Sequence, residues 1–544
     1  MALVVFRNGG VFDGSRHRTG QAVVVEGDRI LAVVEEPELA GLDVTGGTEV
    51  DLAGGLVLPG FVDAHVHPVQ GGLERIRCDL SEAHTREDYL RTVREYAAAH
   101  PELPWILGGG WAMSAFPGGT PTAADLDAVV PDRPVFLPNR DHHGAWVNSR
   151  AMEIAGIGPD SPDPAHGRFE RDADGRPTGT LHEGAMAVVS RHCPPTTDDE
   201  TYRGLLEGQR YLHSLGVTAW QDAILGAYAG ADDASPTYLR AATSGDLTGT
   251  VVGALWWDRE RGVEQVPELV ERRRRFTSGR LRATSVKIMQ DGVAENGTAA
   301  MSEPYLDRCG HVGDNRGHSF VEAAALRTAV HRLDGEGFQV HVHCIGDRAV
   351  RETLDAFEGL DPGRDLRHHI AHLQLIRPED VPRFASLGVT ANMQALWACL
   401  DDQMTDLTLP FLGPERARWQ YPFGDLARAG AVLACGSDWP VSTPDPLAAI
   451  HVAVNRWAHG EEGPAGSEPF LPEQALAAEA AFAAYTAGSS RLNHRDDAGV
   501  LRAGAVADLA VLDRDPFAGP AAEIATARVV STWVDGRPVF EASS

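Results

Sequence analysis

Eight short apolar segments, separated by longer helix-like stretches, constrain the fold of this chain most strongly. The segments begin near residues 56, 217, 248, 283, 339, 367, 389 and 431. Strands that alternate with helices are typical of a parallel sheet covered by helices. Eight such units are the count of a TIM (β/α)8 barrel, which we predict over residues 59–497. An open, doubly wound α/β sheet is the alternative.

The two ends of the chain share a different pattern. Residues 1–58 contain short alternating apolar runs interrupted by Gly, Asn and Asp, and the same pattern returns in 498–544. This pattern is typical of β-hairpins, so we predict one small composite β-sandwich built from both ends. The interval after the first barrel strand is far longer than one crossover, and we predict an inserted subdomain at about 70–200.

The charge balance argues against two classes of partner. The chain has 48 basic and 77 acidic residues, a net charge of −29. Nucleic acids and anionic membranes bind clustered positive charge, so we expect neither and predict a small-molecule partner. A homodimer is compatible with the sequence. The six cysteines form no C-x-x-C pair, the N-terminus lacks the pattern of a signal peptide, and no apolar stretch is long enough for a membrane span. We therefore predict a cytoplasmic protein.

Lys287, in the segment ATSVKIMQDG, is the single lysine among the 48 basic residues. Arginine keeps its charge at any accessible pH, whereas a buried lysine can lose its proton. A neutral amine can act as a base, form a Schiff base or capture carbon dioxide as an anionic carbamate. The alternative is an ordinary solvated lysine that pairs with an acidic side chain.

Metal-binding side chains lie at the ends of several predicted strands. His65 and His67 are two residues apart on a strand, so both project from the same face at the end where barrel active sites form. Taken singly, each such residue has a structural alternative, as a core histidine or a helix N-cap. Six of them at the ends of five strands instead predict a metal site. They are His65, His67, Lys287, His343, His372 and Asp438.

The order GFVDAHVHP, SVKIMQDG, HVHCIGD, HHIAHLQ and GSDWP resembles the amidohydrolase superfamily. In detail it is similar to amidohydrolase family 3, which includes the N-substituted formamide deformylases. The resemblance covers nearly the whole chain. It implies a distorted TIM barrel, a composite β-sandwich from both termini and a long insertion after the first barrel strand.

The resemblance also implies a ligand set. One divalent metal would be bound by His65, His67 and Asp438, and a second by His343 and His372, with a carboxylated Lys287 as the bridge. Zinc suits such a site, and manganese, iron and nickel are alternatives. Many relatives carry Glu where this chain has Ala371, so a single-metal enzyme is a further alternative.

This ligand set predicts hydrolysis of a C–N bond, an amide of the N-formyl or N-acyl type, by metal-activated water. Asp438 is the expected general base. His143 either donates to the developing oxyanion or is a surface-loop histidine. Trp111 and Trp439 either line the substrate pocket or pack in the core, and Glu295 either binds a polar substrate group or shapes a turn. The alternatives are a deaminase or a lactone or ester hydrolase and, from another class, a metal-free scaffold protein.

Overall fold

The computed structural model describes residues 3–140, 142, 144–164, 167–228, 232–295, 297–460 and 468–542. Its centre is an eight-stranded sheet in the order β21-β20-β19-β18-β17-β16-β15-β8, with every neighbouring pair parallel. The strands are β8 (Phe61–Val66), β15 (Val217–Leu225), β16 (Thr250–Trp256), β17 (Leu281–Met289), β18 (Gln339–Cys344), β19 (His369–His372), β20 (Thr390–Met393) and β21 (Leu433–Cys435). The predicted barrel is confirmed.

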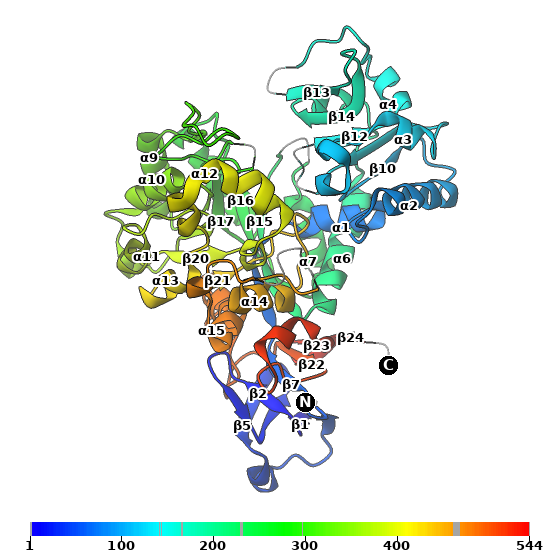
Figure 1. The fold of residues 1–544 in the computed structure, drawn as a ribbon. Coiled ribbons are helices and arrows are strands. Elements are labelled where there is room, and N and C mark those ends of the chain that lie inside the picture. Colours follow the sequence, from blue (N-terminus) through cyan, green and yellow to red (C-terminus); the bar gives the residue numbers. More distant parts are fainter. Residues whose placement is uncertain are drawn as a thin grey trace.

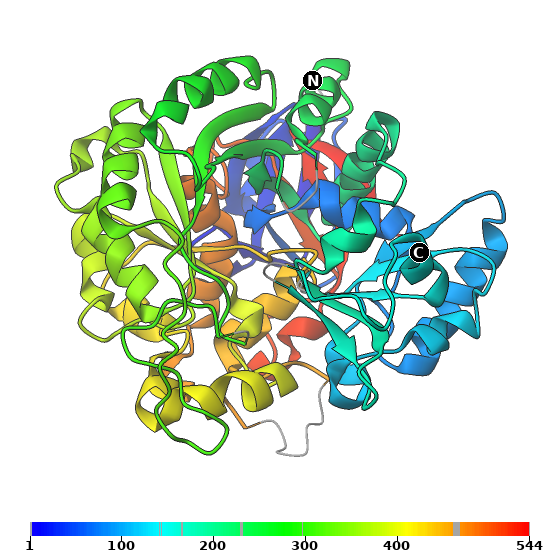
Figure 2. The same ribbon diagram turned by 90° about the horizontal axis from the view of Figure 1, so that it is seen from above.

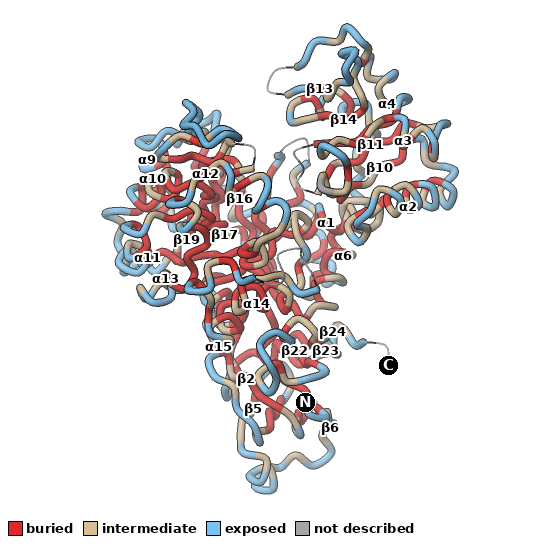
Figure 3. Tube along the Cα trace, in the orientation of Figure 1, coloured by how far each residue is buried: buried red, intermediate tan, exposed pale blue. Residues whose placement is uncertain are grey.

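Helices surround this sheet, as the view from above shows (Figure 2). They include α6 (Asp198–Ser214), α7 (Ser235–Ser244), α8 (Val266–Arg275), α9 (Ala323–Gly335), α10 (Asp347–Phe357), α11 (Val381–Leu387), α13 (Phe423–Arg428) and α14 (Pro446–Asn455). Because helices cover the outside and side chains fill the inside, the strands are buried on both faces (Figure 3). Every residue of β8 and of β18 is buried.

The first and last strands of this order meet where β21 ends. The backbone N–H of Asp438 donates to the carbonyl of His65 at 2.8 Å, and the N–H of His67 donates to the carbonyl of Trp439 at 2.8 Å. These bonds close the ring at the carboxyl ends of the strands. They also fix three of the predicted metal ligands beside one another through the backbone.

Both ends of the chain contribute to one six-stranded sheet, in the order β24-β23-β22-β7-β2-β3. A four-stranded sheet, β5-β4-β1-β6, lies against it, and one hydrophobic cluster draws Phe6, Val57 and Trp533 from the two sheets. The strands are β1 (Leu3–Arg7), β2 (Gly10–Phe12), β3 (His17–Thr19), β4 (Gln21–Glu26), β5 (Arg29–Glu35), β6 (Thr48–Asp51), β7 (Leu56–Pro59), β22 (Leu509–Leu512), β23 (Val529–Val534) and β24 (Arg537–Glu541). The exact domain bounds stay a prediction.

The apolar run that begins at residue 56 is two strands rather than one. Strand β7 pairs with β22 in the terminal sheet, whereas β8 pairs with β15 in the barrel. Gly60 separates them at a crowded position, because a Cβ there would lie 2.3 Å from Cγ2 of Thr218. A glycine therefore allows the chain to pass from one sheet to the other in a single residue.

The chain between β8 and β15 forms a separate six-stranded sheet, β13-β14-β12-β11-β10-β9, which lies at the upper right in Figure 1. Its strands are β9 (Cys78–Asp79), β10 (Ile106–Gly109), β11 (Val135–Pro138), β12 (Gly144–Val147), β13 (Gly167–Arg171) and β14 (Pro177–Glu183). The helices of this region are α2 (Arg86–Ala99), α3 (Ala123–Asp127), α4 (Ser149–Ile154) and α5 (Met186–Ser190).

Helix α1 (Pro68–Ile76) follows His67 directly and packs closely against α6. Glycines make this approach feasible. A Cβ on Gly72 would lie 1.8 Å from the carbonyl oxygen of Gly204, and a Cβ on Gly208 would lie 2.3 Å from that of Pro68. The contact holds the start of α1, and with it His67, against the barrel wall.

Four consecutive arginines, 272–275, stand in the last turn of α8. Positive side chains there complement the negative end of the helix dipole. Arg272 pairs with Asp233 at 2.7 Å and Arg274 pairs with Glu271 at 2.7 Å. This run is therefore partly neutralised within the protein. Across the described residues, no helix combines the length and the apolar character needed to cross a membrane.

Candidate active site

His65, His67 and Asp438 form a compact group at the carboxyl end of the barrel. Their ligand atoms all lie within 4.8 Å of one another. Nε2 of His65 is 3.2 Å from Oδ1 of Asp438, and Nε2 of His67 is 3.0 Å from the same oxygen. His65 lies in β8, whereas His67 and Asp438 follow β8 and β21, the two strands that close the ring, so the closure itself assembles the group.

Lys287 approaches this group from β17. Its side chain is buried, and Nζ lies 3.4 Å from Nε2 of His65. Within the described part of the chain it has no salt bridge. Burial lowers the pKa of the Lys287 amine to about 8, although the negative charge of Asp438 opposes that shift. Part of the Lys287 amine population is therefore neutral near physiological pH.

His343 and His372 stand beside each other on the neighbouring strands β18 and β19. Their ring centroids are 4.2 Å apart, and the ring of His372 stacks on Trp397 with centroids 5.6 Å apart. Among the described residues, neither ring nitrogen of His372 has a hydrogen-bond partner, although the side chain is buried. A buried imidazole with two unsatisfied nitrogens is costly unless a further group binds it, so the site fits a metal ion.

The backbone is strained at two of these positions. His372 has φ 77° and Asp438 has φ 58°, in the left-handed region that side chains other than glycine seldom adopt. Such strain persists where the surrounding structure fixes a functional side chain. Here the two side chains face each other, with Nδ1 of His372 3.9 Å from Oδ2 of Asp438.

The protonation states suit metal binding. Burial and the nearby Lys287 lower the pKa of His65 and of His343 to about 3, so both imidazoles are neutral. Burial acts to raise the pKa of Asp438, but its imidazole neighbours, His65 foremost, hold that pKa well below its usual range. Metal ligands must be neutral imidazoles and ionised carboxylates, and these groups are poised in those forms.

The other predicted site residues have different outcomes. Trp111 is 1% exposed in the core of the insertion, where its ring packs on Trp146 and its indole N–H donates to the Leu137 carbonyl at 2.8 Å. Trp439 packs on Tyr211 of α6, with ring centroids 5.4 Å apart. Both make packing contacts, and their predicted place in the substrate pocket stays a prediction.

Glu295 lies in the segment after β17, where its carboxylate accepts a hydrogen bond from Thr408 at 3.3 Å. It stays a candidate for substrate binding. His143 lies outside the described residues, so its predicted role as an oxyanion donor stays a prediction.

Sequence reasoning missed the residues that support the ligands. The buried carboxylate of Asp63 accepts hydrogen bonds from the backbone N–H of His65 and from Ser437. Nε2 of His341 lies 3.0 Å from Nδ1 of His65. A signal existed, because Asp63 and His341 each stand two residues before a predicted ligand and so face the same way along a strand.

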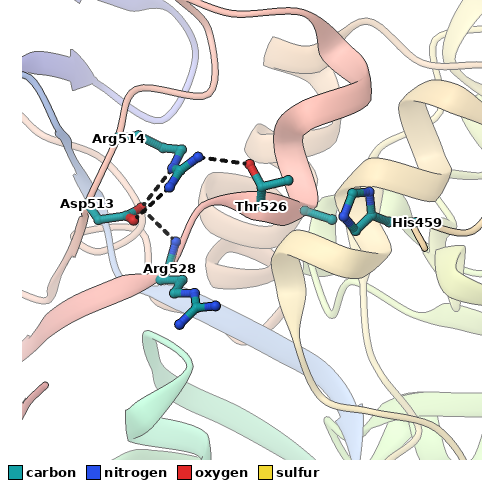
Figure 4. A pocket seen from close by; sticks show the side chains of 6 residues that line it. His459, Asp513, Arg514, Thr526 and Arg528 are labelled. Atoms are coloured by element: carbon teal, nitrogen blue, oxygen red, sulfur yellow. Dashed lines mark hydrogen bonds and ion pairs between the residues drawn. The ribbon is translucent and has the colours of Figure 1, made fainter.

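Two other features attract attention but lie outside this group. Asp307, Cys309 and His311 bring their ligand atoms together on an exposed turn. A surface pocket of about 560 Å³ near the terminal strands is lined by charged residues that already pair, since Arg514 contacts both Asp513 and Thr526 (Figure 4). None of its lining residues belongs to the ligand group.

The fold and the site together define a (β/α)8-barrel protein with a candidate metal centre at the carboxyl ends of its strands. The model of the amidohydrolase family matches residues 48–540. The chain therefore belongs to the amidohydrolase family. This confirms the resemblance inferred from the strand-end motifs.

Individual relatives agree with the family assignment. The chain is 30% identical to the protein LONG AFTER FAR-RED 3 of Arabidopsis thaliana, covering 99% of this chain and 92% of the relative. It is 27% identical to the N-substituted formamide deformylase of Arthrobacter pascens, covering 96% and 95%. The crystal structure of an uncharacterized metal-dependent hydrolase from Pyrococcus furiosus matches with a TM-score of 0.71 and 27% identity, covering 95% of this chain and 100% of that one. These findings support a metal-dependent hydrolase.

Proposed function

We propose that this protein hydrolyses a C–N bond, an amide of the N-formyl or N-acyl type, in a small molecule. The observation that carries the proposal is the convergence of neutral imidazoles, one ionised carboxylate and one buried lysine at the barrel mouth. The similarity of this chain to an N-substituted formamide deformylase supports an amide as the substrate. The aromatic ring of Trp397 stacks on the ring of His372.

The proximity of these side chains supports the proposed ligand set. His65, His67 and Asp438 would hold one divalent metal, and His343 and His372 a second. When bound, such a metal supplies Lewis acidity that polarises a carbonyl and lowers the pKa of water. Zinc suits the imidazole-rich set.

A carboxylated Lys287 would offset part of the positive charge of the two metals. Attack of its neutral amine on carbon dioxide forms an N–C bond and releases one proton, which converts the side chain into an anionic carbamate. Arginine cannot do this, because its guanidinium stays protonated. The absence of a salt-bridge partner for Lys287 among the described residues agrees with a group whose charge changes sign on modification.

Asp438 is the proposed general base. Its carboxylate is ionised, and Oδ1 and Oδ2 face imidazoles on both sides of the site. It would accept a proton from the attacking water and return it to the departing nitrogen, so that an amine and a carboxylic acid leave. Glu295 is the proposed contact for a polar substrate group, and His143 the proposed oxyanion donor.

The first experiment measures zinc per chain by elemental analysis, in the wild type and in Lys287→Arg, after purification with zinc and bicarbonate. Cys309→Ser is prepared in both backgrounds, so that zinc bound at the exposed turn of Asp307, Cys309 and His311 is not counted. We expect about two metals in the wild type and one or none in Lys287→Arg. Release of amine from N-formyl and N-acyl compounds is then assayed with the zinc-loaded protein.

The alternatives predict other results. One metal in both proteins would favour the mononuclear site, and release of ammonia from aminated heterocycles would identify a deaminase. Hydrolysis of lactones or esters without amide hydrolysis would identify the third type of activity. No metal in either protein would overturn the hydrolase proposal and favour a scaffold.

A further inference from the structure

We propose that His341 is a positioning residue that keeps the proton of His65 on Nδ1, so that the Nε2 lone pair of His65 faces the metal site. This inference rests on the proposed function, because it concerns how one ligand of the proposed metal is oriented. It adds a second layer of histidines beneath the ligands.

The geometry separates the two nitrogens of His65. Nε2 faces the ligand group, 3.2 Å from Asp438 Oδ1 and 3.4 Å from Lys287 Nζ. Nδ1 points the other way, into the barrel, and lies 3.0 Å from Nε2 of His341. His341 is completely buried on β18, one layer below His343.

Metal binding through Nε2 of His65 would determine the tautomers of both rings. A hydrogen bond between two neutral imidazoles needs one N–H donor and one lone-pair acceptor. If Nε2 of His65 offers its lone pair to a metal, the proton of His65 is on Nδ1, which donates to His341. His341 therefore accepts through Nε2 and carries its own proton on Nδ1. A hydrogen-bonded partner of this kind fixes both the tautomer and the ring orientation of a metal-binding histidine.

The surroundings hold the ring of His341 in place. Its ring packs on that of His369, with centroids 4.1 Å apart. The side-chain amide of Asn392 donates to the carbonyl of Ala64 at 2.9 Å and contacts Nδ1 of His369 at 3.2 Å, which orients the lower ring.

The test compares zinc affinity in three variants by competition with a chromophoric chelator. His341→Leu fills similar space and accepts no hydrogen bond, whereas His341→Gln keeps an acceptor oxygen. His451→Leu is the matched control, because it removes a buried imidazole of α14 whose ring contacts among the described residues, with Trp457 and His459, do not include His65 or His341. All carry Cys309→Ser, and thermal unfolding and circular dichroism of the metal-free proteins report the fold.

We expect zinc affinity to fall about 10- to 100-fold in His341→Leu. His341→Gln should recover most of the loss, and His451→Leu should bind nearly as the wild type does. Wild-type affinity in a folded His341→Leu protein would overturn the inference and leave the proposed function standing. Absence of zinc binding in the wild type would instead overturn the proposed function itself.

If His341→Leu does not fold, His341→Gln is compared with His341→Asn, whose amide is one methylene shorter and does not reach His65. Tighter zinc binding in His341→Gln supports the positioning role. Equal affinity in these two variants refutes it.

Discussion

Ser437 donates two hydrogen bonds to the buried carboxylate of Asp63, from its backbone N–H at 3.0 Å and from its hydroxyl at 2.5 Å. The backbone N–H of His65 donates to the same carboxylate at 3.1 Å. Asp63 thus connects the first barrel strand to the loop after the eighth. The two segments lie close together, because a Cβ on Gly436 would lie 2.5 Å from the backbone nitrogen of His65.

Ser437→Ala should lower the stability of the protein. The substitution removes a donor from a buried carboxylate, which costs about 1–3 kcal/mol of the free energy of unfolding. Urea unfolding followed by tryptophan fluorescence measures the change. Ser386→Ala, at an exposed helix position, is the control and should change stability by less than about 0.5 kcal/mol. Equal stability of the two variants would show that the hydrogen bond from the Ser437 hydroxyl to Asp63 does not stabilise the closed barrel.

Asp438→Asn should remove most of the activity while the protein stays folded. An amide cannot accept the proton of the attacking water, and loss of a general base lowers the rate by about 10²- to 10⁴-fold. The rate is measured on the zinc-loaded protein, and metal content is determined on the same sample to separate lost catalysis from lost metal. A variant that retains both zinc and the wild-type rate would remove Asp438 from the role of base.

Gly72→Ala should be strongly destabilising. The new methyl would lie 1.8 Å from the carbonyl oxygen of Gly204, so α1 must move away from α6. Such overpacking costs about 1–3 kcal/mol, and it displaces helix α1, which follows His67 directly. The melting temperature and zinc affinity should both fall.

Gly335→Ala is the control for that experiment, because Gly335 is an exposed helical glycine with nothing within 4 Å of an added Cβ. It should leave stability unchanged or raise it by up to about 1 kcal/mol. If Gly72→Ala behaves like Gly335→Ala, the α1–α6 contact is more adaptable than its geometry indicates.

His213→Gln should weaken the dependence of stability on acid pH. His213 is buried, and Nδ1 contacts the Val217 carbonyl and Nε2 the Thr248 hydroxyl, both at 2.8 Å, which suits one neutral tautomer. Burial lowers the pKa of His213 to about 4, below the usual value of about 6.5 for a histidine. Between these two pH values the unfolded chain binds a proton that the folded protein does not.

The folded protein is therefore favoured fully above pH 6.5 and loses this contribution as the pH falls toward 4, by about 3 kcal/mol in total. Urea unfolding of the wild type at several pH values measures the slope, which should be shallower in His213→Gln. His311→Gln, at an exposed position, should keep the wild-type slope. Identical slopes in all three proteins would contradict the assignment.

The sequence by itself determined the barrel and which polar side chains stand at the carboxyl ends of its strands. Apolar strands and helices alternate over short distances, and parallel strands all end at one face, so residues placed at strand ends must gather there. The strand order therefore predicts a cluster of His65, Lys287, His343, His372 and Asp438 at the carboxyl end of the barrel, although it specifies no distances. The single lysine indicated the unusual chemistry, because residue type alone separates an amine from a guanidinium.

The tertiary structure decided the remainder. It divided the apolar run near residue 56 at Gly60, placed Trp111 in the core of the insertion, and joined His65 to His341 across 276 residues of sequence. Periodicity carries no information about which side chains meet across a closed ring. Contacts such as those of Asp63 with Ser437 depend on the final packing of distant segments, and that packing is set by the whole fold rather than by any local pattern.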